Sequence, residues 1–171
     1  TTVIHVLYGP QDRESWGNGL AVQRAVRAMA WLDTIFGAYP YPQATLLHRI
    51  EGGGTEFPML VMLGGAGESL IFHELGHLYT YGVLANNEWK EGFLDEGFTS
   101  FQTTWYFEEH TAGYDGYAGQ ERFILDLDLD RWSEPVSMVS DEYRDSNTYS
   151  VMIYTKGELF YPMAAGPYVE G

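Results

Sequence analysis

The sequence contains no cysteine, and this absence excludes several classes of protein. A chain of 171 residues without cysteine has no disulfide framework, no thiolate metal site and no thiol nucleophile. Any metal site in the chain must therefore be built from histidine and carboxylate side chains.

Basic side chains are scarce, and long apolar runs are missing. Only 9 Lys and Arg stand against 24 Asp and Glu, which gives a formal net charge of −15. We expect no nucleic-acid partner, because phosphate binding needs a basic face. The longest apolar run, residues 57–67, has 11 residues and is broken by proline and glycine. A membrane span needs about 18 residues, so we expect a soluble protein, in a compartment that the sequence does not specify.

The apolar residues are numerous enough for a folded core, at 45% of the chain, and their spacing predicts an α+β fold. Strands are expected at 2–8, 44–50 and 56–63, and helices at 20–36, 69–81, 91–110 and 150–161. Residues 126–130 alternate acid and leucine and are expected to form a solvated edge, and 163–171 a frayed tail or a truncation point. We predict one domain over 1–171, with a strand-rich part (1–66) and a helical part (67–171).

The most specific motif is His73-Glu74-Leu75-Gly76-His77. On a helix, residues four apart share a face, so both imidazoles can reach one metal ion. Glu74 lies about a third of a turn away, which suits a base beside the metal better than a ligand to it. The motif predicts a zinc site with a third protein ligand and an open fourth position for water.

Spacing alone does not identify the third ligand. His5, His48 and His110 are candidates, although none has a partner at metal-ligand spacing and we expect them to be structural or exposed. Carboxylates on the next helical stretch are candidates as well, and composition does not separate Glu88, Glu91 and Glu96.

A family resemblance favours Glu96. His73 to His77, followed by 18 residues and then Glu96 in the segment LDEGF, resembles the aminopeptidase N-like zinc metallopeptidases. These are gluzincins, a group that includes leukotriene hydrolase, and their motif is usually followed by Leu-Asn-Glu-Gly-Phe. The resemblance implies that Glu96 is the third ligand of one Zn²⁺ ion, with Asp95 in place of the usual Asn.

Two further segments carry the resemblance. Gly53-Gly54-Thr55-Glu56-Phe57 is similar to the family strand Gly-x-Met-Glu-Asn, whose glutamate holds the free α-amino group of the substrate. The resemblance therefore implies that Gly53, Gly54 and Glu56 bind substrate. Tyr154-Thr155-Lys156-Gly157, 58 residues after Glu96, is similar to the segment that bears the family's catalytic tyrosine.

The resemblance implies a thermolysin-like catalytic domain: a small mixed β-sheet followed by helices that carry the zinc ligands. By this reading the chain is a zinc aminopeptidase that removes N-terminal residues from peptides, with Glu74 as general base and Tyr154 as oxyanion donor. It would be a segment of a longer chain whose flanking domains are absent here. Two alternatives remain: a thermolysin-like endopeptidase without an amine anchor, and a catalytically weak zinc-bearing scaffold.

Overall fold

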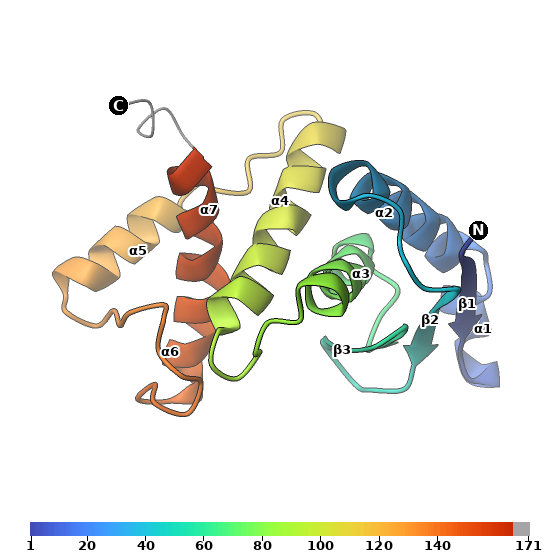
Figure 1. Cartoon of the computed structure of the whole chain (residues 1–171), viewed down its shortest axis with the longest axis horizontal. Helices are drawn as coiled ribbons and strands as arrows, with labels where there is room; N and C mark the ends of the chain where they lie inside the picture. Colours follow the sequence, from blue (N-terminus) through green and yellow to red (C-terminus); the bar gives the residue numbers. More distant parts are fainter. Residues whose placement is uncertain (166–171) are drawn as a thin grey trace. The chain divides into compact units, whose positions relative to one another are not determined.

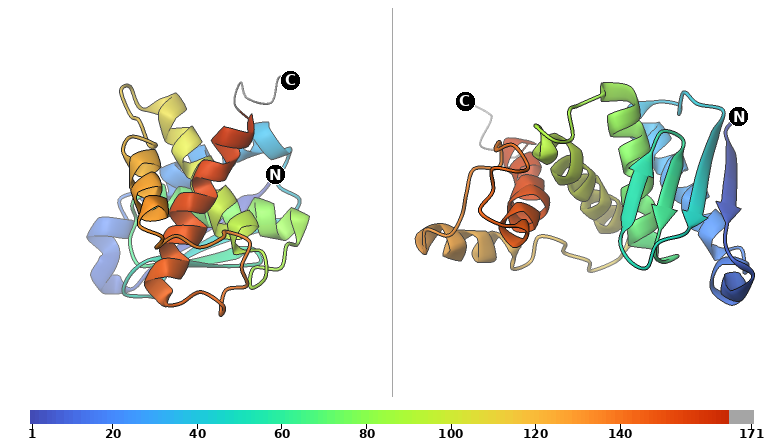
Figure 2. Two further views of the ribbon diagram at one scale, coloured as in Figure 1. Left: turned by 90° about the vertical axis from the view of Figure 1, so that its left-hand side faces the viewer. Right: turned by 90° about the horizontal axis from the view of Figure 1, so that it is seen from below.

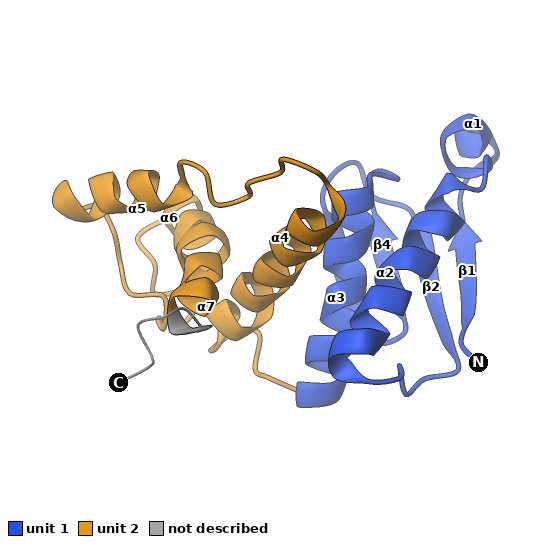
Figure 3. Cartoon of the chain, turned by 90° about the horizontal axis from the view of Figure 1, so that it is seen from above, with its two compact units in different colours: residues 1–84 blue, residues 85–171 orange. Residues whose placement is uncertain are grey.

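The computed structural model describes residues 1–165, and the side chains of residues 1–163. The chain divides into two compact units, Thr1–Leu84 and Ala85–Gly171 (Figure 3). The first unit contains the sheet and the helix that carries the zinc motif, and the second is helical.

The first unit is built on a four-stranded mixed sheet (Figure 1). Its strands are β1 (Val3–Leu7), β2 (Gln43–His48), β3 (Gly54–Phe57) and β4 (Leu60–Leu63), in the order β1-β2-β4-β3. β1, β2 and β4 run parallel, and β3 is antiparallel to β4 at one edge. The prediction of a small mixed sheet followed by the helix that carries the zinc motif is confirmed, although α1 and α2 lie between β1 and β2 in the chain.

The prediction of one strand over residues 56–63 is wrong, because the segment forms a hairpin. β3 ends at Phe57 and β4 begins at Leu60, and Glu56 faces Val61 in the antiparallel register. Pro58 has no N–H to donate to a ladder, and Met59 adopts a left-handed φ of 62°. Both features interrupt a strand, so the chain turns at these two residues and reverses direction.

Two long helices, α2 (Leu20–Phe36) and α3 (Glu68–Leu84), pack together on one face of the sheet (Figure 2). They follow the short turns η1 (Pro10–Asp12) and α1 (Arg13–Trp16) at the start of the unit. On α2 the buried positions include Ala21, Ala25 and Ala28, whose small side chains permit close helix packing. On α3 the buried residues are Ile71, Phe72 and all of 74–80, as expected of a core helix.

The second unit consists of helical segments. They are η2 (Phe93–Gly97), α4 (Phe98–His110), α5 (Gln120–Leu129), α6 (Ser146–Ser150), η3 (Val151–Lys156) and α7 (Gly157–Ala165). η2 and η3 are π-helical turns that continue directly into α4 and α7. The core of this unit is the buried cluster of Ile124, Tyr143, Met152, Ile153 and Leu159. The helices predicted at 91–110 and 150–161 are confirmed, but their π-helical turns were not predicted.

Residues 126–129 form the end of α5, and Asp126, Asp128, Leu129 and Asp130 are exposed, so the segment is solvated as expected but helical. Ile124 is buried and Leu127 packs against the core of the unit, while Leu125 and Leu129 are exposed. The two apolar residues that contact the core, Ile124 and Leu127, are three residues apart, which is a helical spacing. The alternation of acid and leucine therefore does not indicate a strand.

The end of the chain was predicted to be a frayed tail over 163–171. Residues 163–165 continue α7, and the rest of that prediction lies outside the described residues. Among residues 1–165, none of the helices has both the length and the apolar character needed to cross a membrane.

A buried carboxyl group in the second unit makes its stability depend on pH. Glu158 on α7 is 6% exposed and accepts a hydrogen bond from the Thr104 hydroxyl. Burial is the main cause that raises the pKa of Glu158, and the nearby Glu108 raises it further. As the pH rises from the ordinary carboxyl range through this raised pKa, the unfolded state releases its proton first. The free energy of unfolding should therefore fall over that interval.

Replacing Glu158 with Gln removes the titration and keeps an oxygen that can accept from Thr104. We expect the variant to be more stable than the wild type at pH 7, by on the order of 1 kcal/mol, and to lose this advantage at low pH. Urea unfolding at several pH values measures the difference. Glu142→Gln, which changes an exposed carboxylate of the same unit, serves as the control. A wild-type stability that rises with pH over the same interval would contradict the assignment.

Candidate active site

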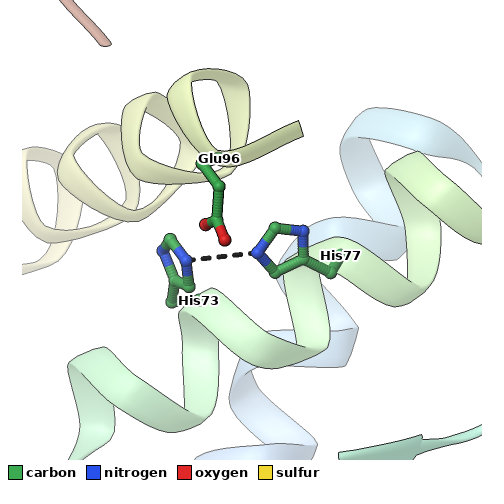
Figure 4. A group of neighbouring side chains, drawn as sticks. All are labelled: His73, His77 and Glu96. Carbon is green, nitrogen blue, oxygen red and sulfur yellow. Dashed lines mark hydrogen bonds between the residues drawn. The ribbon is translucent and has the colours of Figure 1, made fainter. Parts of the chain in front are cut away.

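The two motif histidines lie side by side on α3. Their Nε2 atoms are 3.2 Å apart, and the imidazole rings are close to perpendicular, with centroids 4.9 Å apart (Figure 4). The helical spacing of four residues produces this arrangement, and the apolar neighbours Ile71, Leu75 and Leu78 keep the helix against the core. The imidazole of His77 is 1% exposed.

The separation of the two nitrogens fits a shared zinc ion. Two ligands at about 2.0–2.1 Å from zinc, at a tetrahedral angle, stand about 3.3 Å apart. The observed distance of 3.2 Å between Nε2 of His73 and Nε2 of His77 is close to this value. Imidazole nitrogen is also a donor that zinc prefers. The residues present therefore suit the metal that the motif predicted.

Glu74 lies next to the two histidines and is 4% exposed. It packs directly against β3, because a Cβ atom placed on Gly54 would overlap the Oε1 and Cδ atoms of Glu74. Only glycine leaves room for the carboxylate at this point. The strand GTEF and the helix with the zinc motif are thus in contact at their functional residues, as the contact between α3 and β3 also shows.

Glu56 reaches the same place from β3. Its cross-strand neighbour is Val61, which is completely buried, so Glu56 shares the face of the sheet on which α3 lies. The Oε1 atom of Glu56 is 3.8 Å from Nδ1 of His77, on the side of the ring opposite the Nε2 atom that approaches His73. Gly53 adopts φ 63° and accepts a hydrogen bond of 2.9 Å from the Gly64 N–H, which fixes the start of the strand.

The first unit therefore brings together six of the residues singled out from the sequence: Gly53, Gly54, Glu56, His73, Glu74 and His77. The other two belong to the second unit. Glu96 is in the π-helical turn η2, between the buried residues Asp95 and Gly97, and Tyr154 is in the π-helical turn η3. Their part in the site is a prediction from the resemblance.

Two of the alternative histidine ligands have partners of their own. His48 pairs with Asp12 through its Nδ1 atom at 3.2 Å and stacks on Trp16. His110 approaches the Tyr106 carbonyl with Nδ1 at 2.8 Å and stacks on the Tyr106 ring. These contacts favour structural roles for both side chains.

Two features of these segments were not predicted from the sequence. Gly54 was expected to bind substrate, by resemblance, and not to make room for Glu74. The backbone contact of Gly97 with Ile153 and Gly157 was not expected either. The available signal for both was that glycines lie close in sequence to candidate site residues: Gly54 is two residues before Glu56, Gly97 directly follows Glu96, and Gly157 is three residues after Tyr154.

Comparison with known proteins identifies the class. The profile of the peptidase family M1 domain matches residues 66–166, which is more than half of the chain. The chain therefore belongs to peptidase family M1, and its class is that of the zinc metallopeptidases. The prediction of an aminopeptidase N-like zinc metallopeptidase family is confirmed. No curated protein matches the sequence significantly.

Solved structures show the same fold. An M1 zinc metallopeptidase from Deinococcus radiodurans is similar with a TM-score of 0.62 and 23% identity, over 85% of this chain and 33% of that one. A mutant of that enzyme bound to a Tyr-Ser-Ala substrate is similar with a TM-score of 0.60 and 22% identity, over 83% and 33% of the two chains. The present chain thus spans about a third of the length of these structures.

Proposed function

We propose that this chain supplies the catalytic residues of a zinc-dependent aminopeptidase. The observation that carries the proposal is the position of Glu56, whose carboxylate lies 3.8 Å from the ring of His77. An anion fixed beside a metal ligand offers an anchor for a substrate ammonium group within reach of the metal. An anchored N-terminus limits cleavage to the first peptide bond, which is the property of an exopeptidase.

We propose His73, His77 and Glu96 as the ligands of one zinc ion (Figure 4 draws the three side chains). The separation of the two imidazole nitrogens supports the histidines, and the family motif supports Glu96. When bound, the ion polarises the scissile carbonyl and lowers the pKa of a bound water towards about 7. Two imidazoles and one carboxylate would hold the ion, and a fourth position would be available to water or substrate.

Glu74 is proposed as the general base. Its carboxylate would accept a proton from the attacking water and later donate it to the leaving amine of the cleaved peptide bond. Contact with Gly54 on one side and the helix on the other limits the conformations of this side chain. A base held in one position needs less reorganisation when the proton moves.

Tyr154 is proposed as the oxyanion donor. Its O–H would donate a hydrogen bond to the negative charge that develops on the substrate carbonyl oxygen, and a donor of this kind contributes roughly 3–4 kcal/mol. Glu56, with Gly53 and Gly54, would bind the free α-amino group. The expected partner is a peptide with a free N-terminus, and further domains of a longer chain would complete the walls of the site.

Replacing Glu56 with Ala tests the aminopeptidase assignment against an endopeptidase. Loss of one partner of a buried ion pair costs about 3–5 kcal/mol. We therefore expect kcat/KM for an aminoacyl anilide to fall by more than about 100-fold. An N-acetylated peptide, which has no ammonium group, should be a poor substrate for the wild type and should not lose further activity in the variant.

Glu51→Ala is the matched control, since it removes the same charge from an exposed position five residues earlier. Its kcat/KM should stay within about twofold of the wild type, because exposed charges interact weakly. If Glu56→Ala leaves anilide cleavage unchanged and the wild type cuts N-acetylated peptides equally well, the protein is an endopeptidase and the proposal fails.

A further inference from the structure

Two of the residues assigned above stand on π-helical turns of the second unit. Glu96 is in η2 and Tyr154 is in η3, and each turn leads straight into a regular helix, α4 and α7 respectively. π-helical turns are rare and occur frequently at functional sites. The neighbours of the two turns are therefore informative.

The turns support each other through a contact between two glycines. Gly97 directly follows Glu96, and Gly157 lies three residues after Tyr154. A Cβ atom placed on Gly97 would lie 3.0 Å from the Ile153 carbonyl oxygen and 3.0 Å from the carbonyl carbon of Gly157. A Cβ atom on Gly157 would lie 3.3 Å from the Cα atom of Gly97. Backbone therefore packs on backbone at this point, with no side chain between the turns.

Further contacts hold η2 to the helix that continues η3. The Tyr161 hydroxyl of α7 donates a hydrogen bond of 2.8 Å to the Phe93 carbonyl at the start of η2. The Tyr161 ring also packs on Phe98, with centroids 4.8 Å apart. Burial raises the pKa of Tyr161, so its hydroxyl remains a donor at neutral pH. The beginning and the end of η2 are thus both attached to the η3–α7 segment.

Lys156 fixes η3 from the other side. Its ammonium group donates to the Ser133 hydroxyl at 2.6 Å and to the Asp128 carboxylate at 3.1 Å. These partners lie on α5 and the segment that follows it. The turn with Tyr154 is consequently held between α5 and η2, and a shift of the backbone at Gly157 has little room to relax.

We propose that Gly97 and Gly157 are positioning residues that hold the turn with Tyr154 at a fixed offset from the turn with Glu96. The inference rests on the proposed function, in which Glu96 binds the metal and Tyr154 donates to the substrate oxygen. The metal held by Glu96 and the hydroxyl of Tyr154 would act on the same carbonyl, so the separation of the two residues has to be set before substrate binds. Direct backbone contact sets it more tightly than side chains with several rotamers.

Replacing Gly97 with Ala tests the proposal in the full-length protein. The methyl group must push the η3 backbone away by a few tenths of an ångström, because nothing at that contact is a flexible side chain. We expect kcat for an aminoacyl anilide to fall by about 10-fold or more, with KM within about twofold and zinc still bound at one equivalent. Gly157→Ala should show the same effect more weakly, since its contacts are longer.

Gly92→Ala is the matched control. A Cβ atom at Gly92 would lie 3.1 Å from Cδ1 of Ile153, which is the end of a side chain and not backbone, so kcat should remain within about twofold. A role in packing alone predicts that all three variants change thermal stability and leave kcat of the folded enzyme unchanged. That result would overturn the proposal, and Gly157→Ala keeps the test usable if Gly97→Ala does not fold.

A double-mutant cycle with Tyr154→Phe shows whether Gly97 acts through Tyr154. Once the hydroxyl is absent, Gly97→Ala should cost no more than about twofold in kcat, because misplacing a missing donor has no effect. If the two losses simply multiply, Gly97 does not position Tyr154 and the inference is wrong. A wild-type protein that fails to cleave the anilide with zinc bound would instead refute the proposed function, independently of both glycines.

Discussion

Replacing Glu74 with Gln should reduce kcat for an aminoacyl anilide by roughly 1000-fold, because a general base contributes about 100- to 10,000-fold. Glutamine has nearly the same shape and keeps the packing against Gly54, but its amide cannot accept the proton. Glu74 is not among the proposed ligands, so the variant should still bind one zinc ion. Steady-state kinetics and metal analysis of the same preparation measure both quantities.

Glu68→Gln is the control for this experiment, since it changes a carboxylate on the same helix. Glu68 pairs with Arg27 at 2.7 Å near the surface, and a pair of this kind contributes at most about 1 kcal/mol. Its kcat should therefore match the wild type. A chelator should abolish wild-type turnover, and added zinc should restore it. A wild type that binds zinc but has no turnover would favour a zinc-bearing scaffold.

Gly54→Ala should also lower kcat strongly, although it removes no catalytic group. The new methyl group would occupy the space of the Glu74 carboxylate, so the base has to move. A displacement of about 1 Å in an active site costs on the order of 100-fold in rate, and overpacking costs about 1–3 kcal/mol of stability. We expect kcat to fall by about 100-fold with zinc retained, as measured by kinetics and metal analysis.

Gly52→Ala separates this steric effect from a general loss of flexibility in the glycine-rich segment. A Cβ atom at Gly52 would have no atom within 4 Å, so its activity should remain within about twofold of the wild type. Equal losses in the two variants would show that the segment needs flexible glycines. Full activity of Gly54→Ala would show that Glu74 has no fixed position.

Part of the fold could be predicted because its residues follow simple periodicities. The helix at 20–36 has its predicted bounds, since apolar side chains recur at three and four residues and Gly37 ends it. The strand expected at 56–63 was wrong because the apolar pattern outweighed Pro58, which cannot join a ladder. The division into a strand-rich part (1–66) and a helical part (67–171) of one domain followed the expected secondary structure and stays a prediction. The compact units of the structure divide after Leu84, because α3 packs on α2 and β3.

The site was predictable to the extent that its geometry is local. The spacing of His73 and His77 fixes their approach on any helix, whereas the approach of Glu56 to His77 depends on a hairpin register and was anticipated only through resemblance. The π-helical form of η2 and η3 could not be predicted from the sequence. A π turn and an α turn differ in the pairing of their backbone N–H and C=O groups. The apolar pattern of the sequence does not report that difference.

The π-helical turns also bear on how relatives of this chain are aligned. Each turn holds one residue more than the α-helix that would replace it. A relative one residue shorter across 93–97 could keep helix α4 in place and still lose the widened turn that presents Glu96. The same holds across 151–156 for Tyr154. Under the proposed roles of Glu96 and Tyr154, a one-residue gap in either segment marks a change in the site itself, whereas a gap of equal length in 111–119, between α4 and α5, changes only a connection.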